Sequence, residues 1–383
     1  MNTIIPVPTP CYIIDESQLV QNLEILANII RRTGCKILLA QKAFSLYDLY
    51  PLIGQYLDGT SASGLYEARL GAEAMGKENH VFCPAYQEST FDEIVSLCGH
   101  IIFNSFNQLK QFRKKALGAG RLIGLRINPM YSTQPDHPIY DPCATGSRLG
   151  VTLENFDQDE LDGVSGLHFH TLCEQNSDAL EETLTAVERQ FDPWLGRMSW
   201  LNFGGGHHIT RPDYDIDRLE RCVQRIQDRY GVQVYLEPGE AIALNAGFLA
   251  ATVVDLVRNG MDIAILDASA ACHAPDVLEM PYRPMATNSG LPEEKAYTYR
   301  LGGPTCLAGD VFGDYSFDKP LLVGNQLTFE DMAIYSIVKN NTFNGMPLPT
   351  IAFRRKSGEI EIIRQFGYHD FKDRLGSKGP SND

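Results

Sequence analysis

Positive charge is scarce in this sequence. Its 33 lysine and arginine residues face 48 aspartate and glutamate residues, which gives a formal net charge of −15 over 383 residues. Such a balance is poorly matched to nucleic acid or to an anionic membrane surface, so it disfavours both classes of partner. The same charge is compatible with a cationic small-molecule substrate, although most acidic proteins are acidic only for solubility.

Signals of export and membrane insertion are missing as well. The nine cysteines include no Cys-x-x-Cys pair and do not cluster, which is typical of reduced thiols in a cytosolic protein. The first residues lack the basic and apolar regions of a secretory signal. No apolar stretch approaches the roughly 18 residues that a membrane helix needs. The sequence therefore predicts a cytoplasmic protein without a membrane span.

Short apolar runs alternate with amphipathic segments up to about residue 245. This alternation is typical of a parallel sheet covered by helices, and eight repeats predict a (β/α)8 TIM-like barrel over residues 16–245. An insertion at 130–150, after the fifth strand, is expected among the active-site loops. The predicted strands are 36–41, 56–60, 80–84, 101–105, 122–128, 166–170, 200–203 and 233–237, and the predicted helices include 17–32, 65–75, 106–117, 178–190 and 216–230.

The pattern changes after residue 245, where apolar runs follow one another without long helices and the turns are rich in Gly, Pro and Asn. This predicts a C-terminal, mostly antiparallel β domain over 246–383, so the fold class is α/β plus all-β. Residues 1–15, which have no barrel partner, are assigned to this domain as an additional strand. The strands expected in it are 248–257, 263–267, 296–301, 320–323, 351–353 and 360–363.

Three chemical features follow predicted barrel strands, at the face where barrel enzymes build their sites. Lys42 ends the first strand, where desolvation lowers the pKa of an amine and favours its reaction with a carbonyl group. Gly204–Gly206 follow the seventh strand and allow backbone N–H groups to approach a phosphate. Glu237 ends the eighth strand, where a carboxylate can keep a pyridine nitrogen protonated. Together these are the parts of a pyridoxal-phosphate (PLP) site.

Histidines near these strand ends have two interpretations. His170 can stack on a cofactor ring, or it can be a buried strand histidine that bonds to a backbone carbonyl. His207 and His208 follow the glycines, but adjacent histidines seldom bind one ion, and no carboxylate or thiol has matching spacing. We therefore predict no metal site.

Longer motifs carry a resemblance that spans nearly the whole chain. With them the chain resembles the fold-type III PLP enzymes, alanine racemase-like barrels joined to a β domain, in the branch of ornithine and diaminopimelate decarboxylases. Within that branch it looks most like the carboxynorspermidine (carboxyspermidine) decarboxylases. The motifs are Leu39-Ala-Gln-Lys42-Ala-Phe, His168-Phe-His-Thr-Leu-Cys-Glu174, Asn202-Phe-Gly-Gly-Gly-His-His208, Glu237-Pro-Gly-Glu240-Ala, Pro275-Asp-Val-Leu-Glu-Met-Pro-Tyr282 and Gly303-Pro-Thr-Cys-Leu-Ala-Gly-Asp310.

The resemblance implies PLP as the cofactor and a homodimer with shared active sites. In such a dimer Cys306 would come from the partner subunit and donate a proton to the product; standing alone, the Gly303-Pro-Thr-Cys306 motif would instead predict a core cysteine. The other implied roles are covalent attachment of PLP for Lys42, stacking on the cofactor for His170, phosphate binding for Gly204, Gly205, Gly206 and Tyr335, and pairing with the pyridine nitrogen for Glu237.

Departures from the family pattern bear on the substrate. Glu240 stands where ornithine and diaminopimelate decarboxylases place a phosphate-binding arginine, so we expect it to bind a substrate ammonium instead. Leu307 follows Cys306 where the ornithine-type enzymes have an aspartate that grips a short diamine acid. Asp276 is the best candidate for a second polyamine contact, followed by Glu279 and Asp310, and a solvated loop carboxylate is the alternative for each.

Three functions compete. The leading one is decarboxylation of carboxynorspermidine or carboxyspermidine, which the sequence does not distinguish because one methylene contributes only about 0.8 kcal/mol. The second is a related decarboxylase of meso-diaminopimelate, ornithine or arginine, or an amino-acid racemase; racemases typically place an arginine where this chain has Glu237. The third is a PLP carrier without enzymatic activity, which is disfavoured because carriers resemble the barrel alone.

Overall fold

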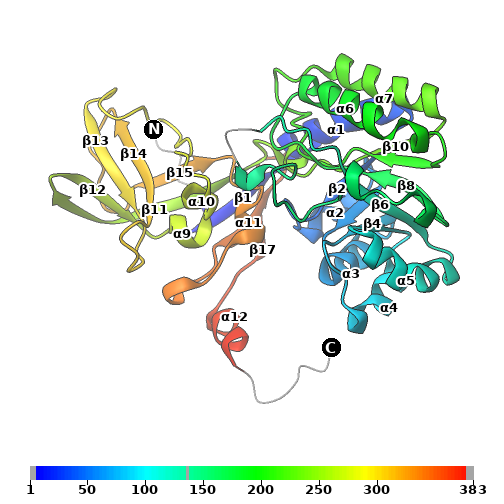
Figure 1. The fold of residues 1–383 in the computed structure, drawn as a ribbon. Helices are drawn as coiled ribbons and strands as arrows, with labels where there is room; N and C mark the ends of the chain where they lie inside the picture. Colours follow the sequence, from blue (N-terminus) through cyan, green and yellow to red (C-terminus); the bar gives the residue numbers. More distant parts are fainter. Residues whose placement is uncertain (1–5, 135–137, 377–383) are drawn as a thin grey trace. The chain divides into compact units, whose positions relative to one another are not determined.

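In the computed structural model, which describes residues 6–134 and 138–376, the chain divides into two compact units. The barrel unit is Gln21–Ile242, and the sheet unit combines Met1–Val20 with Ala243–Asp383. Each unit has its own sheet and its own hydrophobic core. Figure 1 shows both units and labels many of their helices and strands.

Among the described residues, eight parallel strands of the barrel unit form a closed ring, because β5 pairs with both β4 and β6. The predicted (β/α)8 barrel is confirmed, and the short strand β7 (Val151–Thr152) adds to β6 outside the ring. The barrel strands are β2 (Lys36–Ala40), β3 (Gly59–Ala62), β4 (Glu78–Phe82), β5 (His100–Phe103), β6 (Leu122–Asn128), β8 (Val164–His168), β9 (Trp200–Asn202) and β10 (Gln233–Leu236).

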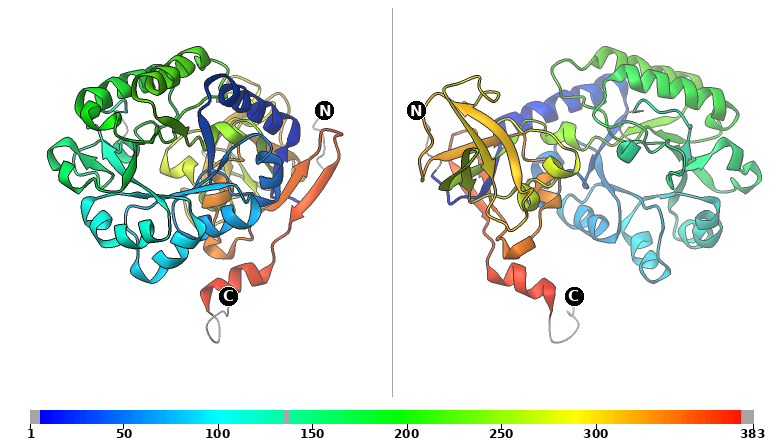
Figure 2. Two further views of the ribbon diagram at one scale, coloured as in Figure 1. Left: turned by 90° about the vertical axis from the view of Figure 1, so that its right-hand side faces the viewer. Right: turned by 60° about the vertical axis from the view of Figure 1, so that its left-hand side comes forward.

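Helices surround this ring, as the left view of Figure 2 shows. Polar caps fix where several of them begin: the Asp215 side chain accepts from the N–H of Arg218, and Ser105 accepts from the N–H of Gln108. The long helix α7 ends at Gly231 in the left-handed conformation. The helices are α1 (Glu16–Thr33), α2 (Tyr50–Ile53), α3 (Leu65–Ala74), α4 (Glu88–Leu97), α5 (Phe106–Gly118), α6 (Ser177–Leu195), α7 (Ile216–Tyr230) and α8 (Glu240–Ala243).

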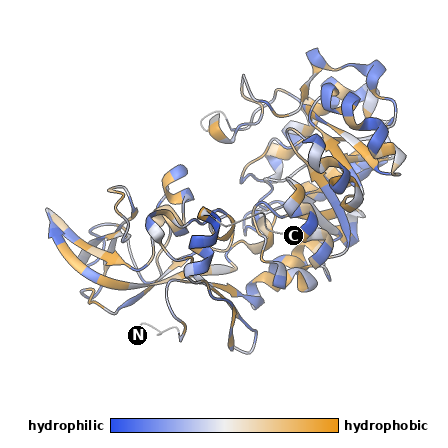
Figure 3. Ribbon diagram, turned by 90° about the horizontal axis from the view of Figure 1, so that it is seen from below, coloured by the Kyte–Doolittle hydropathy of each residue, from blue (hydrophilic) through white to orange (hydrophobic). Residues whose placement is uncertain are grey.

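The interior of the barrel is filled by side chains. Leu38, Ile102, Trp200 and Tyr235 form one buried cluster against Phe82, and they come from five different strands. In Figure 3 the barrel strands are largely apolar, whereas the surrounding helices carry polar residues along their length. The strands therefore hold a rigid frame from which polar side chains at their ends can be positioned.

The sheet unit is built around a mostly antiparallel sheet, as predicted for the C-terminal part of the chain. Strand β1 (Cys11–Asp15) lies between β11 and β16 in this sheet. The other strands are β11 (Gly247–Asn259), β12 (Met261–Leu266), β13 (Tyr297–Gly302), β14 (Val311–Phe317), β15 (Gln326–Glu330), β16 (Thr350–Arg354) and β17 (Ile360–Arg364), and the short helices are α9 (Ala270–His273), α10 (Asp276–Glu279), α11 (Ser336–Lys339) and α12 (Tyr368–Lys372).

Local details differ from the sequence prediction. The expected strand at 320–323 is a turn with Leu322 and Val323 each 60% exposed, and the apolar run alone misled the prediction. Strands β14 and β15 were not predicted. In β14 the Gly313-Asp314 pair has the composition of a turn. In residues 6–134 and 138–376, no helix is both long and apolar enough to cross a membrane.

Candidate active site

Lys42 lies in the turn after β2 and lines a cavity of about 620 Å³ in the barrel unit. The carboxyl ends of several strands supply other walls, including Arg126, His168 and Glu237. Parts of the segment 139–149 line the cavity too, so the predicted insertion borders it. The fold thus brings the predicted lysine, histidine and carboxylate into one concave site.

The surroundings of Lys42 lower the pKa of its amine. The side chain is exposed to the open cavity, but the walls desolvate the ammonium and thereby lower its pKa, and the positive charge of Arg126 lowers it further. A lysine in this state loses its proton more readily than a surface lysine. That property is what a nucleophilic amine requires.

Glu237 is a buried carboxylate with two polar partners. Its Oε1 accepts a hydrogen bond of 2.8 Å from Asn202 Nδ2, and its Oε2 lies 3.4 Å from His168 Nε2. Burial alone would raise the pKa of Glu237, but the interactions with His168, the charge of His80 and the hydrogen bond from Asn202 outweigh it and lower the pKa to about 2. Glu237 therefore presents a fixed negative charge to the cavity at neutral pH.

His170 is held in one orientation. The N–H of Gly205 donates to its Nδ1 at 2.7 Å, which places the ring proton on Nε2, and Arg126 Nη2 donates to its carbonyl oxygen at 3.0 Å. Burial lowers the pKa of His170, and the charges of Lys42 and Arg126 lower it further, so the ring is neutral. A neutral imidazole fixed beside Lys42 fits the predicted stacking role.

Arg126 and Asn202 have roles that the sequence analysis did not assign. Arg126 faces the cavity with its guanidinium 4.6 Å from the centre of the Phe82 ring, and Asn202 bonds to Glu237. Strand periodicity was the available signal, because Asn202 lies two residues after the inward-facing Trp200 and therefore shares its side of the strand.

The glycine loop allows close backbone packing beneath the cavity. The N–H of Gly204 donates to Asn202 Oδ1 and the N–H of Gly205 donates to His170, so both groups are engaged within the protein. A Cβ atom on Gly206 would lie 1.9 Å from the carbonyl oxygen of Leu172. The loop therefore needs glycine for packing, and its predicted contact with a phosphate stays a prediction.

Glu240 lies beside this loop and faces a histidine. Its Oε2 is 2.9 Å from His208 Nε2, and the Glu174 carboxylate is close enough for all three groups to contact one ion. No carboxylate has a metal-ligand spacing to His208 in the sequence. The fold nevertheless brings two glutamates to it, from 34 positions before it and 32 positions after it. With two carboxylates around one imidazole, the group of Glu174, His208 and Glu240 is suitable for binding a cation.

The remaining predicted residues belong to the sheet unit. Cys306 is exposed on a turn, where its N–H donates to Asn344 Oδ1 at 2.7 Å. Tyr335 precedes α11 with φ +55°. Asp276, which the sequence analysis proposed as a polyamine contact, forms an ion pair with Lys339, as Glu279 does.

Asp310 organises the turn that carries Cys306. Its carboxylate is buried and accepts hydrogen bonds from the Ser269 hydroxyl, the Ala271 N–H and the Thr305 hydroxyl. The loop between β13 and β14 is therefore fastened to the start of α9. These contacts give Asp310 a positioning role that the sequence did not indicate.

Comparisons with known proteins agree on one family. A family model described as pyridoxal-dependent decarboxylase, C-terminal sheet domain, matches residues 11–333. The carboxynorspermidine/carboxyspermidine decarboxylase of Campylobacter jejuni is 43% identical over 376 residues, covering 95% of this chain and 98% of that protein. The carboxyaminopropylagmatine decarboxylase of Synechocystis is 44% identical over 372 residues, covering 96% of each. The solved structure of C. jejuni carboxynorspermidine decarboxylase with norspermidine has a TM-score of 0.91 and 42% identity, covering 96% of this chain and 100% of that one.

Proposed function

Because the chain belongs to the pyridoxal-dependent decarboxylase family, we propose that it decarboxylates carboxynorspermidine or carboxyspermidine, releasing CO2 and norspermidine or spermidine. The observation that carries this proposal is the C. jejuni enzyme solved with norspermidine, which is 42% identical and matches nearly the whole of both chains. The chain is thus a lyase of polyamine biosynthesis.

The cavity of the barrel unit fits PLP. An amine with a lowered pKa at Lys42, a fixed carboxylate at Glu237 and a neutral ring at His170 are the groups this cofactor needs. In our proposal Lys42 attaches the cofactor, His170 stacks on it and Glu237 faces its pyridine nitrogen. When bound, PLP supplies an electron sink for the pair released as the carboxylate departs.

The charge of Glu237 favours decarboxylation over racemisation. His168 and Asn202 keep this carboxylate ionised, so it can hold a proton on the facing nitrogen throughout the reaction. Racemases of this fold type typically place an arginine there, which weakens the sink. The negative charge at Glu237 is therefore the chemical feature of this chain that supports carbon dioxide release.

We propose that Glu240, with His208 beside it, binds an ammonium of the polyamine chain. A charge-assisted hydrogen bond of this kind contributes on the order of 1.5–3 kcal/mol. Asp276 is the second proposed contact, with the substrate ammonium replacing Lys339 at its carboxylate. Asp310 contributes indirectly in this scheme, because it holds the turn that carries Cys306.

The working enzyme in this proposal is a homodimer with shared sites. Cys306, an exposed thiol of the sheet unit, donates the proton that replaces the lost carboxylate, and it serves the Lys42 of the partner subunit. Tyr335 is proposed to reach the cofactor phosphate. The support is the resemblance to family members together with the exposure of the Cys306 turn.

Release of CO2 from a panel of carboxylated amines tests the function. We expect turnover of carboxynorspermidine and carboxyspermidine, with little or none for meso-diaminopimelate, L-ornithine and L-arginine. Carboxyaminopropylagmatine belongs in the panel because the Synechocystis relative is 44% identical. A preference for that compound would replace the proposed substrate, and a preference for one of the short amino acids would refute the polyamine assignment.

Glu240→Gln tests the substrate contact. We expect a higher KM for the polyamine substrate with an unchanged absorbance of bound PLP, because the variant loses a charge-assisted contact of about 1.5–3 kcal/mol to an ammonium. His208→Gln, which keeps the carboxylate, is the matched control and should raise KM less. Loss of PLP from Glu240→Gln would show that the residue serves the cofactor instead.

Subunit mixing tests the shared site. Inactive Lys42→Ala and inactive Cys306→Ala chains, exchanged in equal amounts, should recover about a quarter of wild-type activity, because half of the dimers then carry one intact site. If the mixture stays inactive although the subunits exchange, Lys42 and Cys306 act within one chain.

A further inference from the structure

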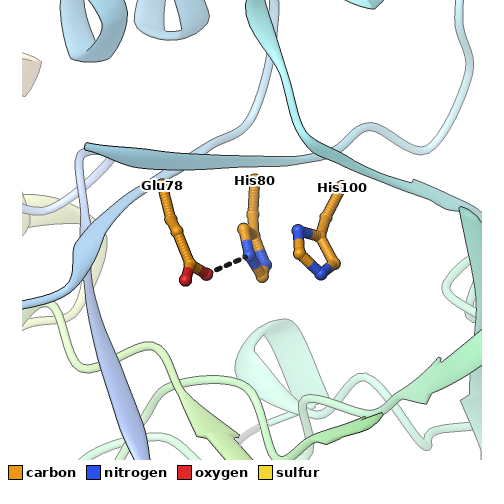
Figure 4. A group of neighbouring side chains, drawn as sticks. All are labelled: Glu78, His80 and His100. Carbon is orange, nitrogen blue, oxygen red and sulfur yellow. Dashed lines mark ion pairs between the residues drawn. The ribbon is translucent and has the colours of Figure 1, made fainter. Parts of the chain in front are cut away.

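Two histidines and a glutamate lie together at the amino-terminal end of the barrel strands. Glu78 and His80 are the first and third residues of β4, so they face the same side of the strand. His100 is the first residue of β5 and pairs with His80 in the register of the two strands. Figure 4 shows the three side chains pointing into one space inside the barrel. None of them lines the cavity that contains Lys42.

His80 is buried without hydrogen bonds. Its side chain has no exposed surface, and within residues 6–134 and 138–376 neither of its ring nitrogens has a hydrogen-bond partner. Its Nε2 lies 3.4 Å from Glu78 Oε2, beyond a good hydrogen bond, and its ring stacks on His100 with 3.8 Å between centroids. An unpartnered buried imidazole is costly, so a ligand that satisfies it would stabilise this end of the barrel.

The three groups match the ligand set of a transition-metal ion. One ligand atom from each of Glu78, His80 and His100 lies within 4.8 Å of the other two. Two imidazole nitrogens and one carboxylate oxygen, with a fourth position for water, suit zinc and other first-row divalent ions.

The surroundings provide access and orientation. The Glu78 side chain is 31% exposed, so an ion can enter from its side, while His80 closes the inner end. The Tyr235 hydroxyl donates to Glu78 Oε2 at 3.1 Å and so fixes the carboxylate, as outer hydrogen bonds do in metal sites. The Lys36 ammonium pairs with the other carboxylate oxygen, Oε1. It leaves Oε2, which faces His80, available to an ion, but its positive charge competes with that ion for the carboxylate.

We propose that Glu78, His80 and His100 bind a first-row divalent metal ion, zinc by preference, at the amino-terminal end of the barrel. The ion ties β4 to β5 and serves stability, since this face of a barrel lies opposite the catalytic end. The site lies outside the cavity that contains Lys42, because the residues proposed for the decarboxylase chemistry in the barrel unit follow the carboxyl ends of the strands.

Cobalt titration tests the site. The full-length, PLP-loaded protein is first dialysed against a chelator and then titrated with Co²⁺. Bound Co²⁺ should give visible d–d bands at one ion per chain, and Zn²⁺ should displace it. Thiolate charge-transfer bands should be missing, because the site contains no cysteine. Such bands would indicate that the ion binds to one or more of the nine cysteines of the chain instead. A spectrum dominated by thiolate bands, or no saturable binding, would overturn the proposal.

Variants assign the binding to these residues. Glu78→Gln and His100→Gln should each weaken Co²⁺ binding more than about ten-fold, and Tyr235→Phe about ten-fold through the lost outer hydrogen bond. His208→Gln, in the second cluster of histidine and carboxylates, should leave the titration unchanged. If His208→Gln abolishes binding while His100→Gln does not, the ion occupies the other cluster and the proposal fails.

Lys36→Met provides a test that does not depend on losing a ligand. It removes the ammonium that competes for Glu78 and keeps all three ligand side chains. We expect tighter Co²⁺ binding and a larger rise in melting temperature on adding Zn²⁺ than for wild type. Weaker or equal binding by a folded Lys36→Met protein would contradict a site that includes Glu78.

Discussion

Substitution of Gly206 by alanine tests the backbone packing beneath the cavity. Gly206 has φ +81°, and a Cβ atom there would lie 1.9 Å from the carbonyl oxygen and 2.3 Å from the carbonyl carbon of Leu172. Non-bonded carbon atoms are most stable about 3.5–4.0 Å apart, so the backbone at Leu172 would have to move. Leu172 is two residues from His170, which means that the change would reach the cavity wall.

Gly231 is a matched control for the conformational part of this effect. It has φ +68°, but a Cβ atom there meets nothing within 4 Å. A left-handed L-residue costs about 1–2 kcal/mol, so Gly231→Ala should lose roughly that much stability. Gly206→Ala should lose about 1–3 kcal/mol more, because overpacking adds to the same conformational cost.

Urea unfolding of the two apoproteins measures the difference between their free energies of unfolding. Apoproteins are used because bound PLP would stabilise the variants to different extents. Dialysis of the PLP-loaded proteins followed by absorbance should show weakened cofactor retention for Gly206→Ala only. If both variants lose the same free energy of unfolding, the backbone of residues 204–206 does not pack against Leu172 as described. If Gly206→Ala is destabilised but retains PLP normally, the loop has a structural role alone.

Two further predictions concern titration. Arg126→Met should shift upward the pH at which half of Lys42 is trapped with PLP by borohydride, because the guanidinium charge helps to lower the pKa of Lys42; an unchanged midpoint would leave desolvation as the only cause. The pKa of His273 is lowered to about 4, mainly by burial, so below pH 6.5 the unfolded chain binds a proton that the folded chain does not bind until about pH 4. The contribution of His273 to stability should therefore fall by up to about 1.4 kcal/mol per pH unit from pH 6.5 to 4. In urea unfolding, His273→Gln should have a shallower dependence of stability on pH than wild type, whereas parallel slopes would contradict the prediction.

Much of the barrel could be predicted from local pattern. Alternation of short apolar runs with amphipathic segments located every barrel strand to within a few residues, and helix α7 was predicted with its observed bounds. Gly313-Asp314 inside β14 misled the same reasoning in the sheet unit. There the strand is stabilised by pairing with β13, a partner that no local window contains.

The sequence indicated which residue types could form the site, whereas the fold determined which side chains contact one another there. Lys42, His170 and Glu237 could be grouped in advance because parallel strands of a barrel carry their active-site residues at one end. The ionisation of Glu237, in contrast, depends on His168 and Asn202, which lie on two other strands. That pairing is fixed by strand register, so residue types alone could not reveal it.

By itself, the sequence determined the fold class and the residues able to carry PLP chemistry, because hydrophobic periodicity and strand-end residues are local properties. Only the tertiary structure decided which charges meet: Glu240 with His208, Asp276 with Lys339, and Glu78 with two histidines. Contacts between side chains distant in the sequence are set by barrel closure and strand register, and these exist only once the whole chain has folded.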